Sequence, residues 1–191
     1  VQVGEYAGRR HVIDVARRLG LSGDMDAIPS LSLGVSEVSL VELTAAYAAI
    51  ANGGTGVWPY AIESVSDRGG RLLYKREGSG AGRVLSREAA AEITDMLVAA
   101  VETGTGRAAR FGRPIAGKTG TAQVTDEHNR VVDLTTWFAS FAPYENPRYA
   151  VVVMVESGSS GGGTCAPIAH DIYEAIVQKE NGGAPKTLAA R

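Results

Sequence analysis

The chain has 191 residues, 45% of them hydrophobic, which is enough for one domain, or a large piece of one, with a buried core. Its 19 basic and 21 acidic side chains leave a formal net charge of -2, so we expect no nucleic-acid partner, because no cationic field is available to bind a phosphate backbone. The longest apolar run, residues 149–155, is far shorter than the roughly 20 residues of a membrane-spanning helix, so we expect no membrane span within this chain.

Two helices are predicted in the first part of the chain. Apolar residues recur at helical spacing in the first, and Gly20 follows as a stop signal. These residues are Val12, Val15, Ala16 and Leu19. In the second, Ser39 and Glu42 form a capping-box pair and the glycines at 53–54 end the helix. Its expected apolar stripe consists of Leu40, Leu43, Ala46, Tyr47 and Ile50.

A hairpin and a third helix are predicted next. Residues 60–77 alternate around a polar, glycine-containing turn at 67–70, which is typical of two antiparallel strands. Ser86 is then suited to cap a long helix over 87–102, which the glycines of residues 103–106 end.

The hydrophobic period then changes from helical to strand-like. Residues 114–124, 131–142 and 149–157 are separated by short polar turns, which predicts an antiparallel meander. A closing helix is expected to begin near Ala166 and Pro167. Its apolar side should carry Ile168, Ile172, Tyr173 and Ile176. The pattern predicts an α+β fold, a mainly antiparallel sheet flanked by helices.

The stretch "GRPIAGKTGTAQV" fits two unrelated patterns for a lysine that binds an anion. Gly112 to Thr119 spell a complete phosphate-binding P-loop. Lys118, Thr119 and Gly120 spell the KTG triad of penicillin-recognising serine enzymes. The flanking sequence has to decide between the two interpretations.

The flanks favour a strand around the lysine. A P-loop needs a buried strand before its glycine turn and a helix that begins at the lysine. Residues 102–111 are polar and broken by glycine, and Lys118 is followed by glycine, threonine and valine, a poor helix start. Glu156, after an apolar strand, imitates the acidic residue of a nucleotide-binding protein. A P-loop NTPase therefore stays as an alternative, to be distinguished by magnesium-dependent nucleotide binding.

A strand gives the triad a chemical use. Lys118, Gly120 and Ala122 would share one face, while Thr119 and Thr121 point the other way. A glycine lets a substrate backbone lie close to the strand edge. The ammonium group and a hydroxyl can hold a carboxylate, and the amide that follows the triad can donate to a carbonyl oxygen.

Three other features have simpler explanations. The GxSxG pattern at residues 158–162 is interpreted as a flexible Gly/Ser loop rather than the nucleophile elbow of a hydrolase. Cys165 is expected to be a small buried residue. Of Trp137 and Phe138, in the strand expected beside Lys118, at least one should pack in the core and one could face a cleft.

The resemblance to a known family extends well beyond the triad. The segments "GKTGTAQ" and "TWFASFAPYENPRYAVVVMVE" resemble the end of the transpeptidase domain of penicillin-binding proteins. Upstream, "SLSLGVSEVSLVELTAAYAAIANGG" and "VETGTGRAARFGRPIAGKTGTA" are similar to that domain in bifunctional synthases, whereas the segment after the triad is closer to monofunctional members. The segment "ESVSDRGGRLLY" between the two upstream segments is also similar, and the resemblance extends over nearly the whole chain.

The resemblance implies a serine β-lactamase-like, D,D-transpeptidase fold and an acyl-serine mechanism. A serine attacks the D-Ala-D-Ala bond of a peptidoglycan stem peptide, an acceptor amine resolves the acyl-enzyme, and β-lactam antibiotics mimic the donor. By position, Lys118 matches the catalytic triad lysine, and Thr119 and Thr121 match carboxylate-binding hydroxyls. Gly120 provides clearance, and the Thr121 amide would be an oxyanion donor. No cofactor or metal is implied.

The chain departs from the family in lacking the nucleophile. The family carries an SxxK and an SxN motif before the KTG triad, and neither occurs in this sequence. We expect both to lie upstream of Val1, in the other half of the same domain. Residues 1–180 would then form the C-terminal part of one transpeptidase domain and 181–191 a flexible tail. The family implies an extracytoplasmic location; a non-catalytic module that retains the fold is the remaining alternative.

Overall fold

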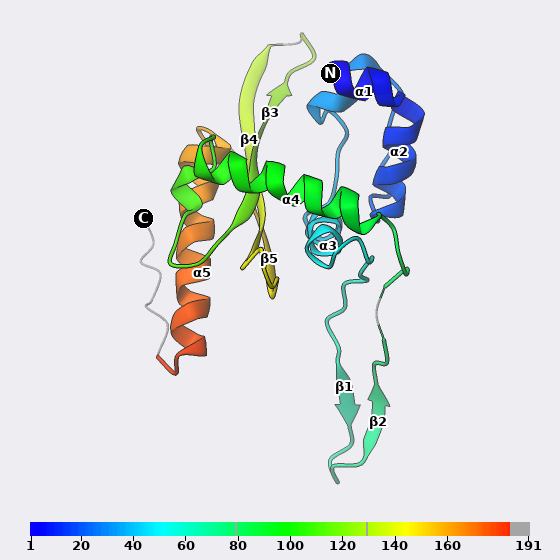
Figure 1. The fold of residues 1–191 in the computed structure, drawn as a ribbon, viewed down its shortest axis with the longest axis vertical. Coiled ribbons are helices and arrows are strands. Elements are labelled where there is room, and N and C mark those ends of the chain that lie inside the picture. The colour runs from blue at the N-terminus through cyan, green and yellow to red at the C-terminus, as the bar shows by residue number, and fades with distance from the viewer. Residues whose placement is uncertain (79, 129, 184–191) are drawn as a thin grey trace.

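The computed structural model describes residues 1–78, 80–128 and 130–183. Helices pack on both faces of an antiparallel sheet, and a hairpin projects away from this body (Figure 1). The tail predicted at 181–191 lies almost entirely outside the described residues. None of the helices in the described part combines the length and apolar character that a bilayer crossing requires.

The N-terminal region contains one predicted helix and one that the pattern did not indicate. The predicted helix is confirmed as α2 (Arg9–Arg18), and Gly20 after it adopts a positive φ of 98°. The additional helix, α1 (Gln2–Ala7), has six residues, too few for an apolar stripe that repeats over several turns. A 3-10 turn, η1 (Pro29–Leu33), precedes α3 (Leu40–Ala51).

The capping box of α3 is confirmed, but its expected apolar stripe is partly wrong. The Glu42 amide donates to Ser39 Oγ at 3.2 Å, and the Ser39 amide donates to the Glu42 carboxylate at 3.5 Å. Leu40, expected in the stripe, is 40% exposed. The buried residues of α3 are Ala45, Ala46, Ala49 and Ile50. Alanines dominate this face because small side chains let the helix approach the sheet closely.

The predicted hairpin consists of β1 (Ser64–Ser66) and β2 (Leu72–Lys75), paired antiparallel. Its turn is fixed by Asp67, whose carboxylate accepts the amides of Gly69 and Arg71, each at 2.9 Å. Every residue of both strands is exposed. The hairpin therefore adds nothing to the core.

The third predicted helix is confirmed as α4 (Arg87–Glu102). Ser86 Oγ accepts the Ala89 amide at 3.0 Å, which is the expected cap. The turn after α4 leads into η2 (Arg107–Ala109) and then into the sheet. Because α4 contributes Leu97 to one cluster of the core and Val101 to the other, it ties the two together.

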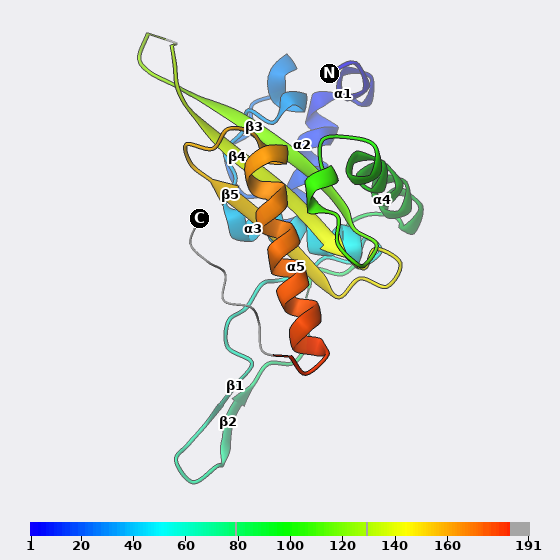
Figure 2. The same ribbon diagram turned by 90° about the vertical axis from the view of Figure 1, so that its left-hand side faces the viewer.

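The meander is confirmed as β3 (Ala116–Thr125), β4 (Val131–Ala142) and β5 (Tyr149–Val155), in the order β3-β4-β5. A π-helical turn, η3 (Gly161–Cys165), leads into α5 (Ala166–Glu180). Figure 2 shows α5 lying across one face of the sheet. On the opposite face, Ala49 and Ile50 of α3 share a buried cluster with Phe141 of β4.

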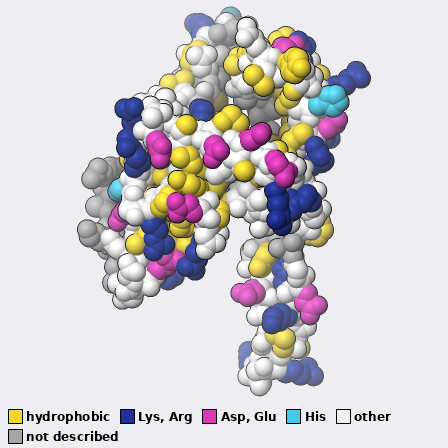
Figure 3. Space-filling view, in the orientation of Figure 1, with side chains coloured by type: hydrophobic (Ala, Val, Ile, Leu, Met, Phe, Trp, Pro, Cys, Tyr) yellow, Lys and Arg dark blue, Asp and Glu magenta, His cyan; other side chains and the backbone are white. Residues whose placement is uncertain are grey.

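The space-filling view shows how differently the two sheets are covered. In Figure 3 the hairpin is a narrow projection that carries acidic and basic side chains as well as apolar ones. Its exposed apolar residues are Val65, Leu72, Leu73 and Tyr74. The meander differs in that part of it lies within the main body, where Phe138 and Phe141 of β4 are fully buried on opposite faces, although its β3–β4 tip is exposed.

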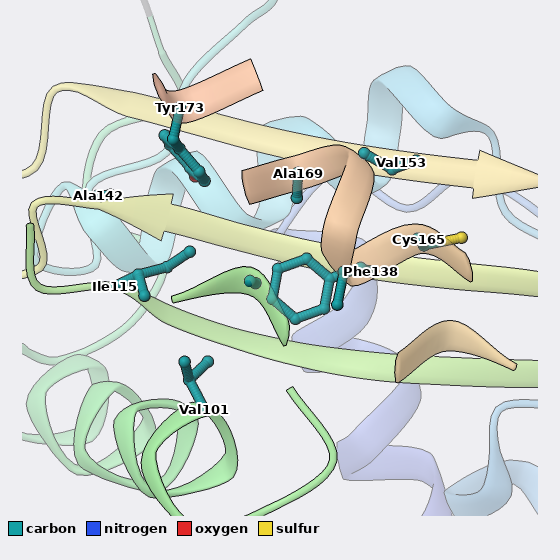
Figure 4. Close-up of a cluster of buried hydrophobic side chains, with 10 residues drawn as sticks. Val101, Ile115, Phe138, Ala142, Val153, Cys165, Ala169 and Tyr173 are labelled. Carbon is teal, nitrogen blue, oxygen red and sulfur yellow. The ribbon is translucent and has the colours of Figure 1, made fainter. Parts of the chain in front are cut away.

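The core beneath α5 is built around Phe138, which is 0% exposed (Figure 4). Ser140 Oγ bonds Tyr173 Oη at 3.1 Å and donates to the Val151 carbonyl at 3.0 Å. Burial raises the pKa of the Tyr173 phenol far above its usual value, so this ring stays neutral. The buried position expected for Cys165 is confirmed.

The apolar side predicted for α5 is only partly correct. Tyr173 is buried, and Ile172 and Ile176 pack against the core at its margin. Ile168 is 38% exposed, and Ala166 and Ala169 occupy the buried positions instead. As in α3, alanines mark the closest approach of the helix to the sheet.

Candidate functional site

The KTG triad lies where β3 leaves the core. Ala116 and Gly117, at the start of the strand, are buried, whereas Lys118 and the residues after it are half-buried or exposed. The β3 strand is also an outer strand of the meander. The triad is thus held by a buried strand end and remains accessible from outside.

The strand register separates the triad into two faces. Thr119 pairs with Phe138 and Thr121 with Thr136, and both of these partners are fully buried on the α5 side of the sheet. Gly120 pairs with Trp137, the aromatic neighbour of Phe138 that is only half-buried. Thr119 and Thr121 therefore share one face, and Lys118 and Gly120 the other, as strand alternation requires.

Among the residues that the structure describes, the Lys118 ammonium group has one hydrogen-bond acceptor. Its Nζ donates to the Thr119 carbonyl at 2.7 Å, and the side chain is exposed. Among the described residues it forms no ion pair. Since an ammonium group carries three protons, two remain for an anionic ligand.

The hydroxyls of the two threonines are engaged by segments distant in sequence. Thr119 Oγ1 lies 2.6 Å from Thr105 Oγ1, in the turn that follows α4. The Gly161 amide, in η3, donates to Thr121 Oγ1 at 3.3 Å. These contacts fix the side chains of Thr119 and Thr121 from the α5 side of the sheet.

Gly161 sits against the sheet so closely that only glycine fits. A Cβ atom there would lie 2.6 Å from the Gly120 carbonyl oxygen and 2.9 Å from the Gly120 nitrogen. A methyl group at Gly162 would lie 2.5 Å from the Thr105 carbonyl oxygen. The segment expected to be a flexible Gly/Ser loop is therefore closely packed against Gly120 of the triad and against Thr105, the partner of Thr119.

The elements around Lys118 do not form a P-loop. Lys118 lies inside β3, and no helix begins there. Between α4 and β3, where all residues are described, the structure has η2 instead of a buried strand. The GxSxG stretch does not form an elbow either, because Ser160 has extended backbone and its Oγ accepts the Gly163 amide at 3.0 Å.

Sequence reasoning missed two contributors to the site. Thr105 was interpreted only as part of a glycine-rich helix stop, and Gly161 only as part of a flexible loop. Their signals were present as "TGTG" and "GSSGGG", since clustered glycines mark close backbone approach as well as turns. The pattern could not indicate what approached them.

Helices on both faces of an antiparallel sheet, with a KTG triad on an outer strand, define the serine β-lactamase-like fold of penicillin-recognising proteins. The family model "Penicillin binding protein transpeptidase domain" matches residues 21–174. The chain belongs to this family.

Three similar proteins illustrate the relationship. Peptidoglycan D,D-transpeptidase PbpA of Mycobacterium tuberculosis is 34% identical over 205 aligned positions, covering 94% of this chain and 42% of the relative. Penicillin-binding protein 1A of Rickettsia typhi is 32% identical over 166 positions, covering 75% and 20%. The structure of penicillin-binding protein A from M. tuberculosis as a penicillin G acyl-enzyme complex superposes with a TM-score of 0.78 at 28% identity, covering 93% and 45%. This chain thus spans less than half the length of each.

Proposed function

We propose that this chain is the KTG-bearing part of a serine-type D,D-transpeptidase that cross-links peptidoglycan stem peptides and is acylated by β-lactams. We use the term parent protein for the whole enzyme. The observation that supports the proposal most strongly is a KTG triad on an accessible outer strand, with the Lys118 ammonium group on one face and the Thr119 and Thr121 hydroxyls on the other, in a member of this family.

The proposed reaction has two steps. A serine oxygen bonds to the carbonyl carbon of the D-Ala-D-Ala peptide, the C–N bond breaks, and D-alanine leaves with the proton of the serine. An acceptor amine then bonds to the same carbon, the ester breaks, and the serine regains a proton from the amine. A β-lactam follows the first step, but its cleaved ring remains attached, so the acyl-enzyme persists.

The roles proposed for the triad are those of the matching family positions. The hydroxyls of Thr119 and Thr121 would hold the carboxylate of the donor, and Lys118, on the other face of the strand, would help to set the electrostatics and proton network of the site. The Thr121 amide would donate to the developing oxyanion. Gly120 would let the substrate backbone lie against β3, because a side chain there would occupy the same space.

The nucleophile must come from outside these residues, since the sequence has neither SxxK nor SxN. An apolar groove beside α3 supports the proposal that another part of the same domain packs against this chain. It is lined by Leu40 and Val41 of α3 and by Trp58 and Tyr60, which are 59% and 54% exposed. We propose that the preceding half of the same domain covers it, because the chain matches only 45% of the similar acyl-enzyme structure.

Domain limits and location complete the proposal. Residues 1–180 would form the C-terminal part of one transpeptidase domain. The parent protein would act outside the cytoplasmic membrane, where its stem-peptide substrate is found.

The test is intact-mass analysis and peptide mapping of the parent protein after incubation with benzylpenicillin. We expect one acyl adduct on a serine outside this chain, formed much more slowly in Lys118→Ala. The matched control is Lys75→Ala, because Lys75 is an exposed lysine of the remote hairpin and its loss should leave the rate unchanged.

The other outcomes distinguish the alternatives. A folded parent protein that forms no adduct would exclude the acyl-serine mechanism and favour a non-catalytic module. Magnesium-dependent ATP binding that is lost in Lys118→Ala would instead support the P-loop interpretation. Equal adduct formation in the Lys118→Ala and Lys75→Ala variants would remove Lys118 from the site.

A further inference from the structure

Two segments, the turn at residues 103–106 and η3, converge on the hydroxyls of Thr119 and Thr121 from the α5 side of the sheet. The turn at residues 103–106 brings Thr105 against Thr119, and Gly162 packs on the Thr105 carbonyl. This turn is itself anchored. The Gly106 amide donates to the Ala100 carbonyl of α4 at 3.0 Å. Thr105 is therefore exposed but held on a fixed backbone.

The protons of the Thr119 and Thr121 hydroxyls can be followed individually. A threonine hydroxyl has one proton to donate and two lone pairs to accept with. Thr121 accepts from the Gly161 amide, which leaves its own proton free. For Thr119 the outcome depends on direction, because either hydroxyl of the Thr105–Thr119 pair can donate.

Only one direction suits an anionic ligand. If Thr119 donates to Thr105, its proton is consumed and its lone pairs face the ligand. If Thr105 donates, the Thr119 proton is free to point at a carboxylate, and the donation behind it polarises the hydroxyl further. Thr119 would then match Thr121, each accepting one hydrogen bond from behind and donating one forward.

We propose that Thr105 is a positioning residue for carboxylate recognition, and that its hydroxyl donates to Thr119 Oγ1 so that Thr119 can donate to the substrate. This inference rests on the proposed function. It assigns Thr105 a role through Thr119, without contact between Thr105 and the ligand.

The variants are Thr105→Val, which keeps the shape and removes the hydroxyl, and Thr105→Ser, which retains the donor. The matched control is Thr103→Val in the same turn, because the Thr103 hydroxyl donates to the Ala99 carbonyl of α4 at 3.0 Å and not to the triad. Acylation of the parent protein is followed with benzylpenicillin and with benzylpenicillin methyl ester, which has no carboxylate.

We expect Thr105→Val to raise the benzylpenicillin concentration that gives half of the maximal acylation rate by about 2- to 10-fold, which corresponds to the loss of one net hydrogen bond. The maximal acylation rate itself should change less. Thr105→Ser should restore the wild-type behaviour, and Thr103→Val should match it. With the methyl ester, wild type and Thr105→Val should be acylated alike, because the ester has no carboxylate charge for the Thr119 hydroxyl to bind.

Each other result overturns the inference. Equal benzylpenicillin kinetics in wild type and Thr105→Val would show that Thr119 needs no donor behind it. An equal loss with the ester would reveal a purely structural role. If Thr105→Val does not fold, Thr105→Ala is measured in its place with the same criteria. A wild-type parent protein that is not acylated at all overturns the proposed function together with this inference, which separates the two failures.

Discussion

The hairpin β1–β2 and the meander β3–β4–β5 are both antiparallel sheets with recognisable strand patterns, yet they use their side chains in opposite ways. In the hairpin, Leu73 is 56% exposed and Tyr74 is 45% exposed. In the meander, Phe138 and Phe141 are 0% exposed. The difference comes from the helices, since α3 and α5 cover the part of the meander that carries Phe138 and Phe141, and none of the described helices covers the hairpin.

This contrast explains why the candidate site lies on the meander. A binding site has to hold its groups within a fraction of an ångström, and only packed neighbours supply that restraint. Lys118 and Thr119 follow directly after the buried Gly117, and segments on the α5 side support the threonines. The hairpin has hydrogen bonds of its own but no comparable support.

The sharpest test of the contrast is removal of one aromatic ring from each sheet. Phe138→Ala should lower the free energy of unfolding by about 3–5 kcal/mol, because it leaves a cavity between β4 and α5. Tyr74→Ala in the hairpin should cost less than about 1 kcal/mol. Both are measured by chemical denaturation of the parent protein, and similar costs for the two would contradict the contrast.

The next effect concerns the close contact between η3 and the triad. Gly161→Ala should destabilise the protein by about 1–3 kcal/mol and slow acylation, because its methyl group would collide with the backbone of Gly120. Gly112→Ala is the control, since a Cβ atom there meets nothing within 4 Å. Chemical denaturation measures the loss of stability, and benzylpenicillin kinetics measure the rate of acylation. Unchanged kinetics in a stable Gly161→Ala variant would refute the proposal that η3 holds the triad in position.

A third test uses the charge cluster at the end of α5. Glu180 accepts from Tyr149 Oη at 2.9 Å and pairs with Arg113 at 2.7 Å and Arg148 at 2.9 Å. The hydrogen bond from Tyr149, helped by the two arginines, lowers the pKa of Glu180 below its usual 4.5, although partial burial opposes the shift.

The sign of the pH effect follows from this lowered pKa. Glu180 contributes its stability fully above pH 4.5, and the contribution is lost as the pH falls through the folded-state pKa. Glu180→Gln should therefore make the unfolding free energy less dependent on pH below that value. The measurement is denaturation at pH 3 to 6, and parallel curves for wild type and variant would rule out this contribution.

The smallest expected effect belongs to the hairpin. Leu73→Thr should change the free energy of unfolding by no more than about 0.5 kcal/mol, because the side chain is already mostly in water and threonine suits a strand. Thermal unfolding of the parent protein is sufficient to measure it. A cost above about 2 kcal/mol would mean that another part of the parent protein buries the hairpin, which would end the contrast.

The strands, the three predicted helices before the meander and the closing helix could be predicted because their signals are local. Ser39 with Glu42 and Ser86 with Ala89 are separated by three residues, and the alternation of β3 is visible within the strand. The buried faces of α3 and α5 were less predictable. Both helices bury alanines where leucine or isoleucine was expected, since the closeness of the sheet decides which side chains fit.

The sequence by itself determined that Lys118 lies on a strand and that Thr119 and Thr121 share a face, because both follow from strand periodicity and the nature of the flanks. Only the tertiary structure decided what lies behind these residues. Thr105 reaches Thr119 across 14 positions and Gly161 reaches Thr121 across 40. Contacts of that separation depend on how helices and turns pack on the sheet, and no local pattern encodes which pairs will meet.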